Sequence, residues 1–168
     1  GKPAHGVVNP RADHGDADAL SYNVSMSGIT LSSHLDLSNA NGTESSVVLV
    51  ADGLVDGLAI GAGTGNNQSS ATTDDDLETY FITYAMGGFT VGMQNSKVDA
   101  QTANTDIERD AYGVSFAVNE NLSISYGVSE TEYSDTSITS DEENSGISAS
   151  YTAGGMTVGL VHNKKDNA

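Results

Sequence analysis

The chain has 168 residues, with 6 Lys and Arg against 23 Asp and Glu, which gives a formal net charge of −17. This balance argues against nucleic acid as a partner, because phosphate binding needs a basic face, and against docking on anionic lipid through a polybasic segment. Cysteine is absent, which excludes disulfides and thiolate metal sites, whereas 19 glycines and only 2 prolines are typical of β-strands joined by tight turns.

Neither a spanning helix nor a leader is expected. The most apolar stretch, residues 47–63, is interrupted by Asp52 and Asp56, and a spanning helix needs about 20 nearly uncharged residues. The start of the chain, Gly1 to His5, has no apolar region behind it that would predict a signal peptide. We therefore expect a mature chain or an internal fragment.

Residues 1–19 form the first predicted unit, an irregular segment with the densest charged cluster before any strand. The cluster consists of Arg11, Asp13, His14, Asp16 and Asp18. Its spacing does not fit an EF-hand loop, so no metal site is predicted. The functional interpretation is a charged segment that lines a pore, and an ordinary solvated loop explains the residues at least as well.

Residues 20–168 show the period-two alternation of β-strands. In residues 122–129, Leu, Ile, Tyr and Val share one face, and Ser, Ser, Gly and Ser share the other. Residues 20–27, 89–94, 112–118 and 156–160 repeat this split, whereas residues 47–50 do not alternate. The predicted strands are 20–28, 29–38, 45–52, 55–63, 77–86, 88–97, 109–118, 121–130, 145–153 and 155–164.

Short turns alternate with longer polar stretches along these strands. The turns are expected near Gly28, Gly53, Gly87-Gly88, 119–121 and Gly154-Gly155, and the loops at 39–44, 63–76, 99–108 and 131–144. Residues 84–93 match residues 151–160 at an offset of 67 residues, which we interpret as one hairpin design used twice.

This pattern favours an antiparallel up-and-down transmembrane β-barrel. Strands of 9 to 10 residues are long enough to cross a bilayer at a tilt, and short turns alternate with long loops in outer-membrane barrels. The polar face carries Ser, Thr, Gly and Asn, and charge is expected almost entirely in the loops. A soluble β-sandwich, which would bury the apolar face against a second sheet, is the alternative.

Two sets of side chains follow from the face assignment. The lipid-facing set is Tyr84, Phe89, Val91, Phe116, Ile124 and Tyr151, in which the aromatic rings suit the membrane interface. The lumen-facing set adds His34, Asp36 and Arg109 to the N-terminal cluster, because residues two apart on a strand share a face.

Catalytic chemistry has no specific support. Serine is so frequent that a Ser, His and Asp set arises by chance, and no G-x-S-x-G elbow is present. The stretch Gly61-Ala-Gly63-Thr-Gly65 lacks the lysine of a phosphate loop. The acidic runs 74–76 and 141–143 are expected to be solvated loop segments that could collect divalent cations. No enzyme and no cofactor is predicted.

The run from Asn9 to Tyr22 into the first strand, and hairpins such as 84–93, resemble the general porins of Gram-negative outer membranes, alphaproteobacterial type. The resemblance covers nearly the whole chain. It implies that residues 1–19 are the end of an inward-folded constriction loop, with Arg11, Asp13, Asp16 and Asp18 at the eyelet, and that the protein is a homotrimer. Such porins have about sixteen strands and end on an aromatic residue. The ten strands and the ending Lys164 to Ala168 therefore predict an internal fragment or a smaller barrel.

The expected function is passive diffusion of small hydrophilic solutes or ions through a water-filled β-barrel in the bacterial outer membrane. The expected surroundings are membrane lipid and lipopolysaccharide. The alternative is a soluble, secreted β-sandwich, used as an adhesin or surface-layer module, whose acidic loops bind calcium. A β-barrel enzyme is a third, more distant possibility.

Overall fold

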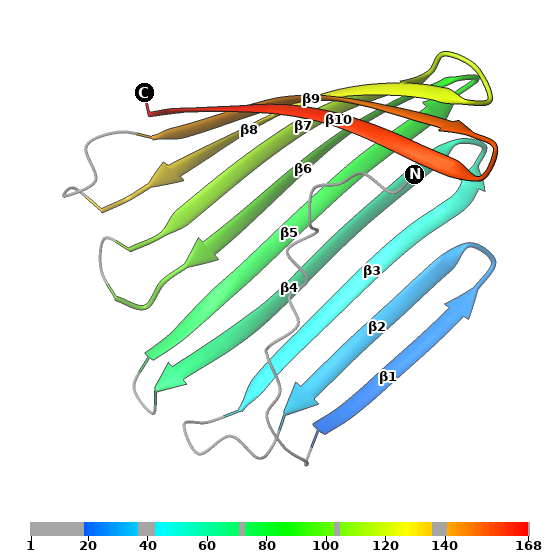
Figure 1. Ribbon diagram of the computed structural model, residues 1–168. Helices are drawn as coiled ribbons and strands as arrows, with labels where there is room; N and C mark the ends of the chain where they lie inside the picture. Colours follow the sequence, from blue (N-terminus) through cyan, green and yellow to red (C-terminus); the bar gives the residue numbers. More distant parts are fainter. Residues whose placement is uncertain (1–18, 37–42, 71–72, 103–104, 136–140, 168) are drawn as a thin grey trace.

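The computed structural model describes residues 19–36, 43–70, 73–102, 105–135 and 141–167. They form ten strands, each hydrogen-bonded antiparallel to the next, in one sheet whose spatial order follows the chain (Figure 1). The strands are β1 (Ala19–Met26), β2 (Ile29–Asp36), β3 (Glu44–Val55), β4 (Leu58–Ser70), β5 (Thr73–Met86), β6 (Phe89–Asp99), β7 (Ile107–Ala117), β8 (Leu122–Tyr133), β9 (Glu142–Ala153) and β10 (Met156–Asn167). The all-β, up-and-down prediction is therefore confirmed.

The β1–β2, β3–β4, β5–β6, β7–β8 and β9–β10 turns gather at one end of the sheet, and the other connections lie at the opposite end (Figure 1). Ser27 and Gly28 have φ angles of 50° and 80°, and Gly154 and Gly155 have 57° and 80°. Two consecutive residues with positive φ match the twist of the strands that they join. The repeated segments 84–93 and 151–160 span the β5–β6 and β9–β10 turns, so they are the same hairpin design used twice.

One predicted turn is wrong. The turn between β3 and β4 lies at Asp56-Gly57, not at Gly53. Gly53, with a φ of 82°, lies inside β3, where the pairing register shifts between Asp52 and Val55. Gly53 and Leu54 have no residue opposite them on β4, which makes a β-bulge that a glycine with positive φ accommodates. Asp-Gly is a strong hairpin signal, and it decides the position of the turn.

The loop predicted at 63–76 is also wrong, because β4 continues to Ser70 and β5 starts at Thr73. The acidic run 74–76 therefore lies in a strand, as do Glu142 and Glu143. Backbone pairing continues past the apolar segments, since hydrogen bonds between strands do not require apolar side chains. The strands are accordingly 8 to 14 residues long, and all of them except β1 and β2 exceed the predicted 9 to 10.

The described residues contain no buried hydrophobic side chain and no second sheet against which one could pack. Large apolar side chains are exposed along the sheet, from Leu20 (65%) to Leu160 (71%). The described part of the chain therefore lacks the core of a β-sandwich. It also contains no helix long and apolar enough to cross a membrane.

Candidate functional site

The two faces of the sheet differ in side-chain chemistry and in exposure. On β8, Ile124 and Tyr126 are 42% and 50% exposed, whereas Ser129, on the opposite face, is 3% exposed. A curved sheet crowds the side chains on its concave face and spreads those on its convex face. Burial of Thr79, Ser129 and Thr131 therefore identifies the polar face as the concave one. We call this the concave face and the other the outer face.

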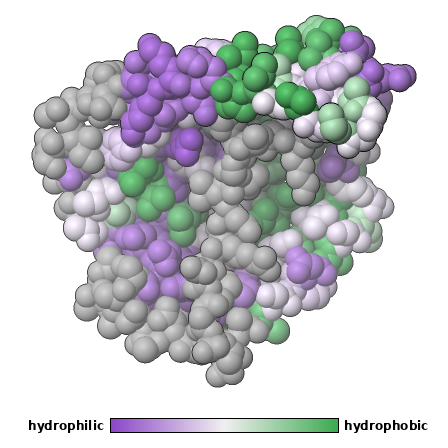
Figure 2. Space-filling model, viewed as in Figure 1, coloured by the Kyte–Doolittle hydropathy of each residue, from purple (hydrophilic) through white to green (hydrophobic). Residues whose placement is uncertain are grey.

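The register extends both faces across the sheet, because directly opposed residues share a face. On the outer face, one row contains Val91, Val114, Tyr126 and Ile147 on four neighbouring strands. The adjacent row on the concave face contains Thr90, Ser115, Ser125 and Ser148. In Figure 2, β10 at the top of the view is hydrophobic towards its turn end and hydrophilic towards its loop end.

The predicted lipid-facing residues all lie on the outer face. Five of them are exposed, namely Tyr84 (42%), Phe89 (51%), Val91 (48%), Ile124 (42%) and Tyr151 (49%). Phe116 is less exposed, because its ring stacks on that of Phe89 with centroids 4.2 Å apart. Together they belong to an apolar band on the outer face.

Hydroxyl side chains pair across strands on the concave face. The Oγ atoms of Ser125 and Ser148 are 2.7 Å apart, and Thr152 pairs with Thr157 at 2.9 Å. The hydrogen bond between Ser21 Oγ and His34 Nδ1, at 2.7 Å, occupies the equivalent position on β1 and β2. It therefore repeats a structural pattern of this face and does not single out a nucleophile.

A denser polar network covers the concave face towards the loop end. The hydroxyls of Thr79 and Ser96 are 3.0 Å apart, and Gln94 Nε2 donates to Ser96 Oγ at 3.1 Å. Arg109 on β7 donates to Ser129 Oγ at 3.2 Å. These bonds fix the orientation of side chains on the concave face.

Glu142 is the carboxylate of this network. It accepts a hydrogen bond from Asn144 Nδ2 at 2.8 Å and forms an ion pair with Lys165. Glu142 lies nearer the loop end of the strands than the apolar band does. The adjacent row on the outer face carries Glu130 and Glu143. The hydrogen bond from Asn144, and then that from Lys165, lowers the pKa of Glu142 below its ordinary value.

A row of apolar side chains lies on the concave face between this network and the loop end of the strands. Leu77, Val98, Ile107 and Tyr133 are cross-strand neighbours on β5, β6, β7 and β8. They border a cavity of about 290 Å³, lined by Leu77, Glu78, Thr79, Ser96, Lys97, Val98, Ile107, Arg109, Thr131, Tyr133 and Glu142. Towards this end of the strands, apolar side chains lie on the concave face, whereas in the apolar band they lie on the outer face.

The outer face carries charge at the same level, contrary to the prediction that charge stays in the loops. Asp110, Glu130, Glu143 and Asp166 occupy one row on β7 to β10. Asn95, the partner of Asp110 on β6, is buried and donates to Asp110 at 3.0 Å. The strands therefore extend beyond the apolar band into a region that tolerates ionised side chains.

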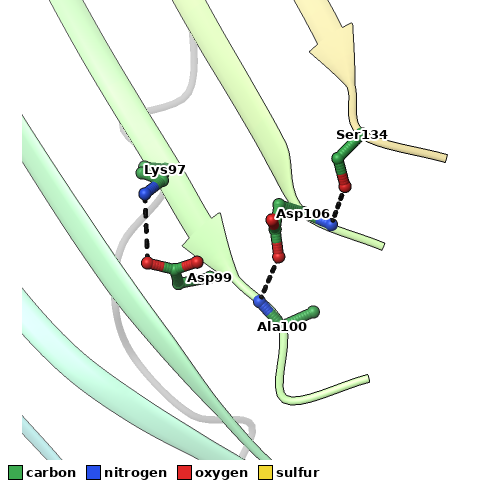
Figure 3. Close-up of polar contacts among 5 residues, drawn as sticks. All are labelled: Lys97, Asp99, Ala100, Asp106 and Ser134. Atoms are coloured by element: carbon green, nitrogen blue, oxygen red, sulfur yellow. Dashed lines mark hydrogen bonds and ion pairs between the residues drawn. The ribbon is translucent and has the colours of Figure 1, made fainter. Parts of the chain in front are cut away.

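Polar contacts also tie the strand ends together (Figure 3). Lys97 Nζ lies 3.0 Å from Asp99 Oδ2 on the same strand. The backbone N–H of Ala100 donates to Asp106 Oδ1 at 3.0 Å, and the N–H of Asp106 donates to Ser134 Oγ at 2.7 Å. These bonds link the ends of β6, β7 and β8.

The predicted lumen-facing residues are only partly brought together. His34 and Asp36 lie on the concave face of β2, where Asp36 is 7% exposed, and Arg109 lies on the same face of β7 with β3 to β6 between. The remaining predicted residues, Arg11, Asp13, His14, Asp16 and Asp18, lie outside the described residues. No group of three or more potential metal ligands occurs in the described ranges.

Sequence reasoning missed the apolar row on the concave face, Phe81 and the pair of Glu142 with Lys165. Alternation along residues 77–81 already places Leu77 and Phe81 on the face of Thr79. The register was needed to place Leu77 in one row with Val98, Ile107 and Tyr133, and to place Phe81 opposite Gln94.

Similarity to known proteins lies in the fold. No protein-family model matches the chain, and no curated protein matches it. Three solved structures of OmpT, an outer membrane protein of Vibrio cholerae, are similar. The in-vitro folded form has a TM-score of 0.63 at 16% identity, the outer-membrane expressed form 0.64 at 14%, and the trimer form 0.61 at 15%. Each alignment covers 89% of this chain, and 53 to 54% of the OmpT chain.

The chain therefore has the fold of an outer-membrane β-barrel protein, and it spans about half the length of the proteins that it matches. In the described residues, β1 and β10 each pair on one side only.

Proposed function

We propose that the protein is a porin of the bacterial outer membrane, in which small hydrophilic solutes or ions diffuse passively through a water-filled β-barrel. The observation that carries the proposal is the opposition of the two faces across ten strands. The outer face exposes an apolar band, and the concave face opposite that band carries mainly Ser, Thr, Gly and Asn. Lipid suits the first surface, and an aqueous lumen suits the second.

The proposed surroundings follow from the same geometry. Membrane lipid covers the apolar band, and the charged outer row from Asp110 to Asp166 lies at the level of the lipopolysaccharide head groups. Diffusion needs no catalytic group, and we propose no enzymatic step. A homotrimer is part of the proposal, supported by the trimer form known for OmpT.

Solute flux through vesicles that contain the full-length protein tests the proposal. Liposomes should swell in isotonic arabinose or glucose and less in larger oligosaccharides, since the lumen limits solute size. Vesicles without protein provide the control. Protein that is inserted and folded, and that gives no flux of any of these sugars, would show that the lumen is not an open path.

A further inference from the structure

We infer that the cavity at the loop end of the concave face is a binding site for small aromatic or aliphatic carboxylates, for which benzoate is a suitable probe. The inference rests on the proposed function, because it names a class of solute that would bind to the pore wall on its way through. It is carried by two features of the cavity, an apolar row and an arginine beside it.

The apolar row is unusual in its position. Elsewhere on this face the cross-strand rows mostly carry hydroxyl groups and glycine, as in Ser115 and Ser125. The apolar residues Val48, Val50 and Phe81 also lie on it, but each stands between polar residues or glycine. The row of Leu77, Val98 and Ile107 instead presents apolar side chains to an aqueous path, and Ile107 is 37% exposed. Exposed apolar surface is favourable to cover, and the cavity of about 290 Å³ is large enough for one small solute.

Arg109 supplies the cavity with a guanidinium, and the lining also includes Glu78, Lys97 and Glu142. Arg109 follows Ile107 on the same face of β7, because residues two apart share a face. Among the described residues it donates to Ser129 and makes no ion pair within contact distance. Glu142, in the same concave row, is paired with Lys165, and the charge of Arg109 also helps to lower the pKa of Glu142. A guanidinium has five N–H donors in a planar fork that matches a carboxylate.

The two features select an amphipathic anion. Its ring or alkyl chain would cover the apolar row, while its carboxylate would accept hydrogen bonds from Arg109. A purely polar solute would gain nothing from the row. A cation of the same shape could not accept hydrogen bonds from Arg109, so the site should distinguish solutes by charge and by apolar surface.

Binding of benzoate to the full-length protein in detergent tests the inference, with NMR saturation transfer as the readout. Benzoate should bind, acetate should bind much more weakly, and benzylamine should show no site-specific binding. Arg109→Gln and Ile107→Ser should each weaken benzoate binding about tenfold. Arg109→Lys, which keeps the charge, should recover part of the affinity.

Two variants outside the cavity serve as controls, Lys164→Gln on the outer face and Val161→Ser on β10, and both should bind benzoate like the parent protein. Equal binding of benzoate and benzylamine, or equal affinities in Arg109→Gln and Lys164→Gln, would overturn the inference. So would absence of benzoate binding, the result expected if a segment of the same chain covers the row.

The outcomes separate this inference from the proposed function. Sugar flux without benzoate binding would refute the site and leave the porin proposal in place. Benzoate binding that depends on Arg109, in a protein that gives no sugar flux, would refute the porin proposal and leave the site.

Discussion

At the scale of single residues, backbone sterics set the hairpin end of the sheet. Gly57 has a φ of 74°, and a Cβ atom placed on it would lie 2.0 Å from the carbonyl oxygen of Ala85. The amide of Ala85 donates to the carbonyl of Gly57 at 2.7 Å, so β5 approaches this turn closely. Gly53 also has positive φ, but no atom lies within 4 Å of its Cβ position.

The two glycines therefore make a matched pair. Gly53→Ala should lower the free energy of unfolding by about 1–3 kcal/mol, the cost of positive φ in a residue with a side chain. Gly57→Ala should cost clearly more, because the clash adds to the same backbone cost. Urea unfolding of the full-length protein in lipid vesicles measures both, and equal losses would show that the close approach to Ala85 is wrong.

Glu142 makes a residue-level prediction about pH. Its hydrogen bonds with Asn144 and Lys165 lower its pKa in the folded protein. A carboxyl whose folded pKa is depressed contributes stability above its unfolded pKa, and the contribution is lost as the pH falls through the folded pKa. Unfolding free energy should therefore decrease more steeply on acidification below the ordinary pKa in the parent protein than in Glu142→Gln. Identical pH profiles would exclude the contribution.

At the scale of the strand, alternation is the property that determines what each side chain meets. Val91 is 48% exposed on the outer face of β6, within the apolar band, and Thr90 lies on the concave face beside Ser115. The two residues are adjacent in the chain and thus lie at nearly the same depth. They differ in the medium that each side chain faces.

Val91→Arg should therefore lower the free energy of unfolding in lipid vesicles by about 2–4 kcal/mol, the cost of arginine near the bilayer midplane. Thr90→Arg should cost far less and should reduce the conductance of the pore, since its side chain enters the lumen. Folding titrations and planar-bilayer recordings measure the two effects. Equal destabilisation at both positions would refute the assignment of the faces.

The presence of the strands, and the face on which each side chain lies, could be predicted from the sequence because both depend on a local period of two. The end points could not, since Gly63 to Asp76 contains turn-forming and acidic residues that pair as strand all the same. The position of Gly53 in a bulge also depends on pairing with β4. Likewise, Glu142 meets Lys165 only through the register of β9 with β10.

At the scale of the whole molecule, the net charge of −17 predicts the ion selectivity of the proposed lumen. Carboxylates around an aqueous path with low-dielectric walls raise the local concentration of cations. Screening limits their reach to about 8–10 Å near physiological salt, so only carboxylates beside the path should act. Arg109 on the concave face opposes this bias locally.

Neutralising Asp13, Asp16 and Asp18 to Asn should shift the reversal potential across a salt gradient towards anions, and more strongly at low salt. The reason is the loss of negative charge from a segment that we predict to line the constriction. Planar bilayers with the full-length protein give the measurement. An anion preference in the parent protein, or no shift at low salt, would place this segment away from the constriction.

In the proposed porin the concave face lines water and the outer face meets lipid, and the absence of cysteine from the chain allows a direct test. Cysteine is introduced singly at Ile124, Ser125 and Tyr126 of full-length protein in vesicles, and labelling by a membrane-impermeant thiol reagent is measured. Ser125→Cys should react rapidly, because it faces water. Ile124→Cys and Tyr126→Cys should be protected, because residues 124 and 126 face lipid. Rapid labelling of all three variants, or protection of Ser125→Cys alone, would show that the two faces are assigned wrongly.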